Sequence, residues 1–357
     1  MAMVAHRVVG PSLRVGSGPV DAVDALQRIA FLLERSGAPT FKVRAFRRAA
    51  SGTRELGPER LAELHAGGHL RDIAGVGDTT ARVIAEALSG QEPTYLRHLE
   101  QEERAVPTAA VVALRSLLQG DCHSHSDWSD GGSPIGDMAE AARHLGHRYL
   151  ALTDHSPRLT VAHGLNPERL RRQLDDVAAL NETMFPFRIL TGIEVDIFED
   201  GALDQEEDLL GRLDVVVASV HSKLRMKRDQ MTRRMVRAIE SPHTDILGHC
   251  TGRLLVGRGR PQSEFDPEVV FEACARTGTA VEINSRPERR DPPVELLRTA
   301  VDADCWVSID TDAHAPGQLD WLDFGCEQAL EAAVPEDRIV NAWSPERLLT
   351  WTAGHAA

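Results

Sequence analysis

Short apolar runs alternate with amphipathic helical patterns from residue 117 onward, and this alternation limits most strongly the folds open to the chain. Near-continuous apolar runs are typical of strands that are buried on both faces in a parallel sheet. Seven such strands are expected, at residues 117–120, 148–153, 189–193, 215–220, 245–248, 280–284 and 306–309. Each is followed by a helical pattern, so the sequence predicts an α/β fold with a seven-stranded barrel.

Helix boundary signals support this alternation. A cap residue followed by proline marks four expected helix starts, at Ser133-Pro134, Asn166-Pro167, Asp266-Pro267 and Ser344-Pro345. Gly146 and Gly278 stand where two of the helices should end.

Histidines and carboxylates follow the predicted strands at their carboxyl ends. The set is His123, His125, Asp130, His155, Glu194, His221, His249, Asp312 and His314. On an extended segment, His123 and His125 point their rings to the same side, so both reach one ion. Any one of these residues is equally an ordinary loop histidine or helix cap. Their repetition at six strand ends predicts an active site, because barrel enzymes build their sites at this end.

This set of donors indicates a metal centre. Imidazoles and carboxylates without thiolates suit Zn²⁺, Mn²⁺ or Fe²⁺ better than Mg²⁺ or Ca²⁺. Nine ligands are too many for one ion and enough for two or three ions that share ligands. Such ions lower the pKa of a shared water to form hydroxide, and they neutralise phosphate oxygens. Hydrolysis of a phosphoester is the expected reaction.

Cationic side chains and one further histidine are candidates near the same end. Arg253 closely follows the fifth strand and is a candidate clamp for a phosphate oxygen. Lys223 and Arg225 belong to a basic loop that either contacts a phosphate backbone or is simply solvated. His163 is either a catalytic acid beside the ligands or an ordinary loop residue. With Glu194, Arg253 and His163 complete the set of candidate catalytic residues.

The first hundred residues have a helical pattern. Val23, Leu26, Ile29, Ala30 and Leu33 recur at the spacing of one buried helix face, and a second helix begins near residue 41. Later, a Gly-Val-Gly turn at residues 75–77 precedes another helix. Its glycines allow close approach to a phosphate, and the next helix offers free N–H groups, although a tight helix connection without a ligand is the alternative. The expected contacts to DNA backbone are Lys42, Arg44, Arg47, Arg48, Gly75 and Gly77.

This region, from about residue 20 to residue 99, resembles the helix-hairpin-helix domain at the N-terminus of family-X DNA polymerases, the class of DNA polymerase beta. The basic run at residues 41–50 and the Gly-Val-Gly turn carry the resemblance. In that family a lysine on the helix after the turn can act as a lyase nucleophile. Here the helix has Thr79, Arg82 and Val83 and no lysine. Arginine stays protonated and cannot form a Schiff base, so a DNA grip without lyase chemistry is expected.

From residue 120 onward the chain resembles the polymerase and histidinol phosphatase (PHP) family, in the branch formed by the C-terminal domain of bacterial family-X DNA polymerases. The motifs are His-x-His, Thr-Asp-His, Gly-Ile-Glu, Ser-Val-His-Ser, Gly-His-Cys-Thr-Gly-Arg and Asp-Thr-Asp-Ala-His, in this order. The resemblance implies a distorted seven-stranded barrel with a trinuclear metal centre. Only about twenty residues separate the helical region from the barrel. No polymerase palm fits there, so polymerase activity is not expected.

The same family pattern implies how the ligands divide among three ions. The first ion would be held by His123, His125 and Asp312, the second by His221 and His249, and the third by Asp130, His155 and His314. Glu194 would bridge the first two.

Composition bounds the compartment and the partners. The expected segments are a flexible arm at 1–18, the DNA-binding domain at 19–99, a helical connector at 100–119 and the phosphoesterase barrel at 120–357. A net charge of −14 counts against nucleic acid unless the acidic groups surround cations. Five cysteines without a Cys-x-x-Cys pair favour the reducing cytoplasm, and Cys122 and Cys250 should have packing roles. Neither a membrane span nor a signal peptide is expected.

Three classes of function remain open. The first is a DNA-processing phosphoesterase that acts at 3′ ends or abasic sites. The second is a small-molecule phosphatase, such as one for histidinol phosphate. The third, a DNA-binding adaptor with a structural metal centre, is disfavoured by nine ligands with catalytic spacing. The metal identity, the choice between phosphomonoester and phosphodiester, and the oligomeric state stay open.

Overall fold

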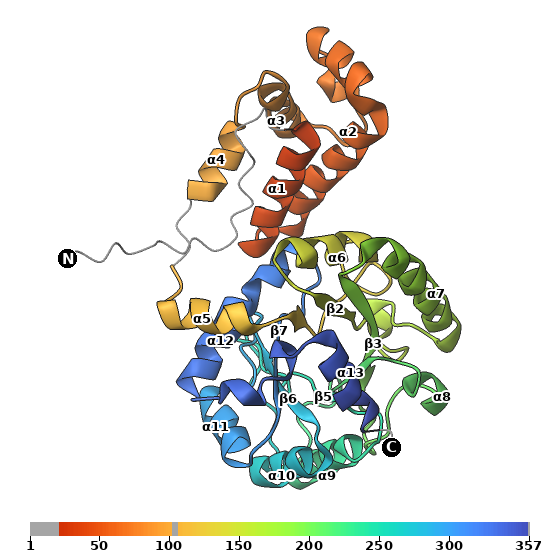
Figure 1. The fold of residues 1–357 in the computed structure, drawn as a ribbon, viewed down its shortest axis with the longest axis vertical. Helices are drawn as coiled ribbons and strands as arrows, with labels where there is room; N and C mark the ends of the chain where they lie inside the picture. The colour runs from red at the N-terminus through yellow and green to blue at the C-terminus, as the bar shows by residue number, and fades with distance from the viewer. Residues whose placement is uncertain (1–20, 102–105, 356–357) are drawn as a thin grey trace, which may run out of the picture. The chain divides into compact units, whose positions relative to one another are not determined.

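The computed structural model describes residues 21–101 and 106–355 of the 357-residue chain. The arm expected at residues 1–18 lies outside these ranges. Two compact units make up the chain, Met1–Val106 and Pro107–Ala357 (Figure 1). The domain boundaries derived from the sequence stay predictions.

The first unit is entirely helical where it is described. Its elements are α1 (Ala22–Arg35), α2 (Thr40–Ala66), the 3₁₀ turn η1 (Leu70–Asp72), α3 (Asp78–Leu88) and α4 (Thr94–Gln101). The Asp21 side chain caps α1 by accepting the Val23 N–H at 2.8 Å. Leu26 and Ile29 of α1 pack with Phe46 of α2 in one buried cluster. The helical periodicity of the sequence therefore marks the buried face of α1.

Helix α2 consists of two helical pieces. The sequence predicts separate short helical pieces near residues 61–64 and 70, and the second piece of α2 and η1 lie at these positions. Gly57 has a φ of 72° and is followed by Pro58, so the helix is kinked there. Glycine and proline thus separate the two helical pieces of α2.

The second unit is built on seven parallel strands, whose order in the sheet is their order in the chain. They are β1 (Gly120–Asp121), β2 (Tyr149–Leu152), β3 (Arg188–Asp196), β4 (Val215–Ser219), β5 (Ile246–Leu247), β6 (Ala280–Asn284) and β7 (Val307–Asp310). All but the first residue and Thr191 of β3 are buried along these strands, as expected for a sheet covered on both faces. The predicted seven-stranded α/β barrel is confirmed.

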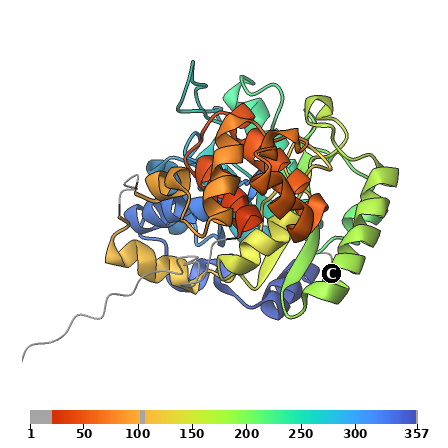
Figure 2. The same ribbon diagram turned by 90° about the horizontal axis from the view of Figure 1, so that it is seen from above.

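Helices surround the strands of this unit (Figures 1 and 2). They are α5 (Ala109–Leu117), α6 (Ile135–His144), α7 (Pro167–Met184), α8 (Glu207–Leu210), α9 (Arg228–Ile239), α10 (Pro267–Thr277), α11 (Val294–Asp302), α12 (Leu322–Glu331) and α13 (Pro345–Ala353). The predicted caps hold at α7, α10 and α13, where Asn166, Asp266 and Ser344 each accept a backbone N–H of the first turn. Gly278 ends α10 with a φ of 85°.

The strand predicted at residues 117–120 is wrong in its bounds. Leu117 is the last residue of α5, and β1 comprises only Gly120 and Asp121. Helix α5 packs against Cys326 and Ala329 of α12, so part of the expected connector belongs to the barrel unit. Apolar residues at a helix end and at a buried strand look alike over so short a run.

Side chains join β1 to β7, the first and last strands of the sheet. The Cys122 N–H donates to Asp310 Oδ1 at 2.7 Å, and the Thr311 N–H donates to Asp121 Oδ2 at 3.2 Å. Beyond the strands, the His125 N–H donates to the Ala313 carbonyl at 2.8 Å. These contacts draw the His-x-His segment after β1 toward the segment after β7.

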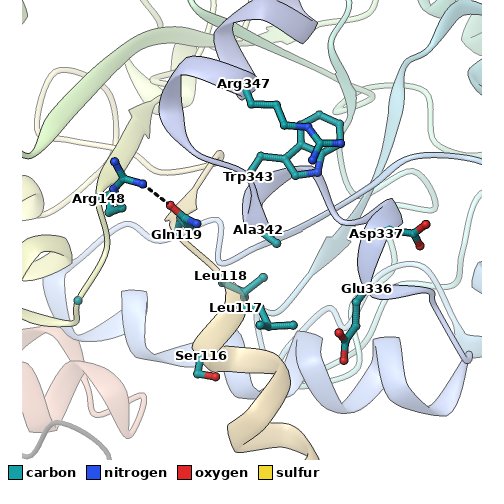
Figure 3. A pocket seen from close by; sticks show the side chains of 11 residues that line it. Ser116, Leu117, Leu118, Gln119, Arg148, Glu336, Asp337, Ala342, Trp343 and Arg347 are labelled. Carbon is teal, nitrogen blue, oxygen red and sulfur yellow. Dashed lines mark hydrogen bonds between the residues drawn. The ribbon is translucent and has the colours of Figure 1, made fainter.

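The C-terminal segment covers the amino ends of the strands. Val340, Trp343 and Leu348 pack with Tyr149 of β2 and Val215 of β4. A pocket of about 620 Å³ lies at this end, with Arg148, Trp343 and Arg347 around it (Figure 3). Its described lining includes none of the predicted ligands. Within the described residues, no helix combines the length and apolar character that a membrane crossing needs.

Candidate metal centre

The nine predicted ligands converge at the carboxyl end of the barrel. Three overlapping groups, each with ligand atoms within 4.8 Å of one another, are His125, Asp130, His155 and His314; His123, His125 and Glu194; and His155, Glu194 and His221. The other two predicted ligands adjoin them. His249 Nε2 lies 2.8 Å from Glu194 Oε1, and Asp312 Oδ1 lies 3.3 Å from His125 Nε2.

Glu194 lies at the centre of the histidines. It projects from β3 itself, because this strand extends past the predicted end to Asp196. Its Oε2 is 2.8 Å from His155 Nδ1 and 3.4 Å from His123 Nε2. Its Oε1 is 3.1 Å from His221 Nε2. A carboxylate with rings on both of its oxygens has the arrangement that a bridging ligand requires.

Burial and charge set the protonation of this cluster. Burial alone would raise the pKa of Glu194, but His221 and His123 outweigh it and hold this pKa well below its usual range. Burial lowers the pKa of His125 to about 3, and repulsion from His314 adds to the effect. At neutral pH Glu194 is therefore an anion and His125 a neutral imidazole, which are the forms that bind metal ions.

Many polar atoms of the cluster are buried without a hydrogen bond. They are His123 Nε2, both ring nitrogens of His125 and of His221, His249 Nδ1 and Glu194 Oε2. Buried polar groups in proteins are normally hydrogen-bonded, and a concentration of unpaired donors and acceptors needs a reason. Divalent cations would satisfy these imidazoles and this carboxylate together, so the residues fit a multinuclear metal centre.

Four buried carboxylates that the sequence analysis did not assign hold the ligand segments in place. They are Asp154, Asp196, Glu282 and Asp291. Asp154 accepts the Ser126 N–H at 2.9 Å, and Asp196 accepts the His221 N–H at 3.2 Å. Asp154 stands in the Thr-Asp-His motif, Asp196 and Glu282 lie in β3 and β6, and Asp291 lies in the loop between β6 and α11. For Glu282, its place inside the apolar run 280–284 was the available signal.

Arg253 faces a neighbouring loop. Its Nε donates to the Arg289 carbonyl at 2.9 Å, and its Nη2 donates to the Arg290 carbonyl. Its guanidinium thereby holds the segment after β6. From that segment, Arg289 Nε lies 3.3 Å from Asp312 Oδ2 and Arg286 Nη1 lies 3.2 Å from His314 Nδ1. The sequence analysis missed these two arginines, although they are the ones that reach the cluster.

His163 lies in an exposed loop, and Cys122 and Cys250 lie in the apolar core. His163 is exposed with a φ of 56°, and its carbonyl accepts a bond from Arg169. Its role as a catalytic acid stays a prediction. Cys122 and Cys250 are free, buried and packed in apolar clusters, as expected from their positions.

The predicted DNA contacts of the first unit differ in their surroundings. Lys42, Arg44 and Arg48 are exposed on α2. Arg47 Nε instead donates to the buried carboxylate of Glu34 at 2.7 Å, so its guanidinium joins α2 to α1.

Both glycines of the turn are exposed, and each has a local reason. Gly75 has a φ of 80°, and a Cβ there would meet the Cβ of Arg48 at 2.9 Å, so only glycine suits this position. Gly77 precedes α3, and its N–H donates to Thr80 Oγ1 at 2.9 Å. In the second unit, Lys223 and Arg225 are exposed between β4 and α9. DNA contact by any of these residues stays a prediction.

Comparisons with known proteins agree with this geometry. The PHP domain model matches residues 121–286, and a helix-hairpin-helix domain model matches residues 20–92. A probable phosphatase of Shewanella sediminis (strain HAW-EB3) is 31% identical over 251 residues, which are 66% of this chain and 94% of that protein. The chain belongs to the PHP family. Its resemblance to that family and its nature as a metal-dependent phosphoesterase are thereby confirmed.

Two further similarities extend the comparison of this PHP protein. The DNA polymerase/3′-5′ exonuclease PolX of Bacillus subtilis (strain 168) is 38% identical over 252 residues, which are 71% of this chain and 44% of that polymerase. The chain thus spans less than half the length of this relative. The crystal structure of histidinol phosphate phosphatase from Lactococcus lactis, complexed with zinc, L-histidinol and phosphate, is 18% identical with a TM-score of 0.42. That match covers 60% of this chain and 93% of the other.

Proposed function

We propose that this PHP phosphoesterase processes DNA, at 3′ ends or at abasic sites. The observation that carries the proposal is a helix-hairpin-helix domain on the same chain as the metal centre. A relative named as a polymerase and 3′-5′ exonuclease supports it. The exposed Lys42, Arg44 and Arg48 offer positive charge for a phosphate backbone. The five described cysteines are free and buried, which supports the cytoplasm as the compartment.

The cofactors in this proposal are two or three ions of Zn²⁺, Mn²⁺ or Fe²⁺. When bound, they supply an activated water and neutralise phosphate charge. Glu194 would bridge two of them, since its two oxygens face different histidines. His125 has ring contacts toward both Asp312 and Glu194, which supports its place in the same group as His123.

Arginines on one flank would hold the anionic group of the substrate. The Arg289 Nη1 atom is buried without a hydrogen-bond partner, and the Nε atom of the same side chain lies 3.3 Å from Asp312 Oδ2. Such a guanidinium suits the paired oxygens of a phosphate. Arg253 would then act through the loop that it holds, and its bonds to the two loop carbonyls support this indirect role over a direct clamp.

Replacing Arg289 by glutamine is expected to raise the KM for a phosphoester substrate roughly ten-fold or more, because a hydrogen bond from arginine to a charged group is worth about 1.5–3 kcal/mol. Steady-state kinetics on DNA and on a chromogenic phosphodiester would measure it. Arg290→Gln is the matched control, since the neighbouring Arg290 pairs with Glu327 at 3.7 Å. Equal effects of both substitutions would contradict the assignment.

A small-molecule phosphatase is the second candidate function. The alignment with the probable phosphatase spans 94% of that protein and 66% of this chain, so a related protein can consist almost wholly of the shared part. In this case histidinol phosphate or a similar phosphomonoester would be the substrate, and the helical unit would serve another purpose.

One substrate panel separates the two functions. End-labelled DNA, abasic DNA and histidinol phosphate would each be incubated with the enzyme in Mn²⁺ and in Zn²⁺. We expect shortening or end processing of DNA that requires the metal and is slow or absent on histidinol phosphate. Hydrolysis of histidinol phosphate with all DNA substrates left intact would replace the DNA proposal by the phosphatase.

A further inference from the structure

Glu282 is a glutamate in the middle of β6 and is not among the predicted ligands. It has no exposed surface, and the described part of the chain gives it one ion-pair partner, the ring of His123. Its two oxygens are both used: Oε1 lies 2.6 Å from His123 Nδ1, and Oε2 accepts the backbone N–H of His249. Asn284 Nδ2 adds a contact to Oε2 at 3.3 Å. A charge is costly to bury, so this placement needs a function.

The contact with His123 sets which ring nitrogen is available. A carboxylate at Nδ1 favours a proton on that atom and leaves the lone pair on Nε2. Nε2 is the nitrogen that faces the shared centre, 3.4 Å from Glu194 Oε2. Glu282 therefore orients the His123 ring as a metal ligand requires.

The contact with His249 supports an unusual backbone. His249 has a φ of 20°, a value that residues other than glycine rarely adopt. Such a conformation persists where the surroundings impose it. The hydrogen-bonded pairing of β5 with β6 ends at Leu247 and Val281. Two residues after Leu247, the backbone N–H of His249 donates to the side chain of Glu282. With the backbone held in this way, His249 Nε2 reaches 2.8 Å from Glu194 Oε1.

We infer that Glu282 is a positioning residue that holds His123 and His249, from the segments after β1 and β5, in the geometry for metal binding. His123 lies next to Oε2 of Glu194 and His249 next to Oε1. The buried Glu282 carboxylate therefore positions one ligand on each side of Glu194. This role rests on the metal-dependent function proposed above, but it does not depend on which phosphoester is the substrate.

The substitution Glu282→Gln tests this role with almost no change in volume. A carboxylate accepts hydrogen bonds at both oxygens, whereas an amide accepts at one and donates at the other. The variant must therefore either lose one of the bonds to His123 and His249, or donate from its amide to His123 Nδ1, which would place the ring proton on Nε2. We expect its affinity for Zn²⁺, measured by competition with a chromogenic chelator, to fall roughly ten- to a hundred-fold, as for other residues that orient metal ligands. Glu282→Asp keeps both acceptor oxygens and should lose less.

Asp245→Asn is the matched control. Asp245 is also a buried carboxylate, and it also accepts one backbone N–H, from Val216 at 2.8 Å, and one histidine Nδ1, from His355 at 2.8 Å. It precedes β5 at the other end of the barrel. We expect this variant to bind Zn²⁺ as the wild type does, even if its thermal unfolding temperature falls.

A second measurement covers the case in which Glu282→Gln fails to fold. In wild-type protein with Zn²⁺, the nitrogen-15 NMR spectrum should show the His123 ring protonated at Nδ1 and strongly hydrogen-bonded. A ring protonated at Nε2, wild-type affinity in a folded Glu282→Gln variant, or an equal loss in Asp245→Asn would each overturn the inference. Wild-type protein that binds Zn²⁺ but cleaves no DNA would overturn the proposed substrate alone and leave this role standing.

Discussion

Replacing Glu194 by alanine is expected to abolish phosphoester hydrolysis and to remove at least one bound ion. Its carboxylate lies within 3.4 Å of rings from four segments of the barrel, so no other side chain can take over its central position. Metal ions contribute several kcal/mol to such reactions, and we expect a loss of activity of roughly a thousand-fold or more. Activity assays and elemental analysis of the purified variant would measure both effects.

Removing the metals from unaltered enzyme should have the same consequence. Protein treated with a chelator is expected to be inactive and to recover on addition of Mn²⁺ or Zn²⁺. The control for Glu194→Ala is Glu199→Ala, at an exposed glutamate in the loop after β3. This variant should keep both activity and metal content. Circular dichroism would check that the Glu194 variant remains folded. Full activity in chelator-stripped enzyme would refute the metal-dependent mechanism.

Deleting residues 1–105 should weaken DNA cleavage strongly while leaving hydrolysis of a small chromogenic phosphoester nearly intact. If the helical unit holds the DNA backbone, it raises the local concentration of substrate at the barrel. Loss of one of two linked binding sites commonly costs about a hundred-fold or more in apparent affinity, and we expect a rise in the KM for DNA of this order. Each unit has its own apolar core, which makes the truncation a reasonable variant to express.

Charge reversal in the full chain tests the same idea without a deletion. Lys42→Glu combined with Arg44→Glu should raise the KM for DNA. It should also make the affinity for DNA less dependent on salt, because each phosphate contact contributes about 0.9 to the slope of log K against log salt. Arg60→Glu, on the same helix, is the control, since Arg60 pairs with Glu63 at 2.6 Å. If truncation, charge reversal and added salt all leave DNA cleavage unchanged, the helical unit does not recruit DNA.

Local pattern and spacing were enough to predict the barrel. Buried parallel strands need near-continuous apolar runs, and the runs at residues 215–220 and 280–284 correspond to β4 and β6 within a residue. The same logic predicted the convergence of the ligand residues, because the carboxyl ends of parallel strands meet at one end of a barrel. The short run at 117–120 was misassigned, since four residues, two of them leucines, cannot distinguish a helix end from a strand.

What the sequence could not predict is which polar atoms meet across the barrel. Arg253 and Arg289 are both arginines near strand ends, yet one bonds to backbone carbonyls and the other reaches Asp312. Arg47 and Arg48 are adjacent in the chain, yet Arg47 pairs with the buried Glu34 and Arg48 is exposed. These contacts depend on which side chains and carbonyl groups the neighbouring helices and loops present. The spacing of residues along one segment does not contain this information.

The amino-acid sequence by itself determined the order of strands, the end of the barrel that carries the site and the chemical class of its ligands, because all three follow from periodicity and residue type. Only the tertiary structure decided the distances from Glu194 to the histidine rings, and that Glu282 contacts both His123 and His249. The physical reason is that these contacts join residues up to 159 positions apart. Their distances are set by the relative shift of the strands in the sheet.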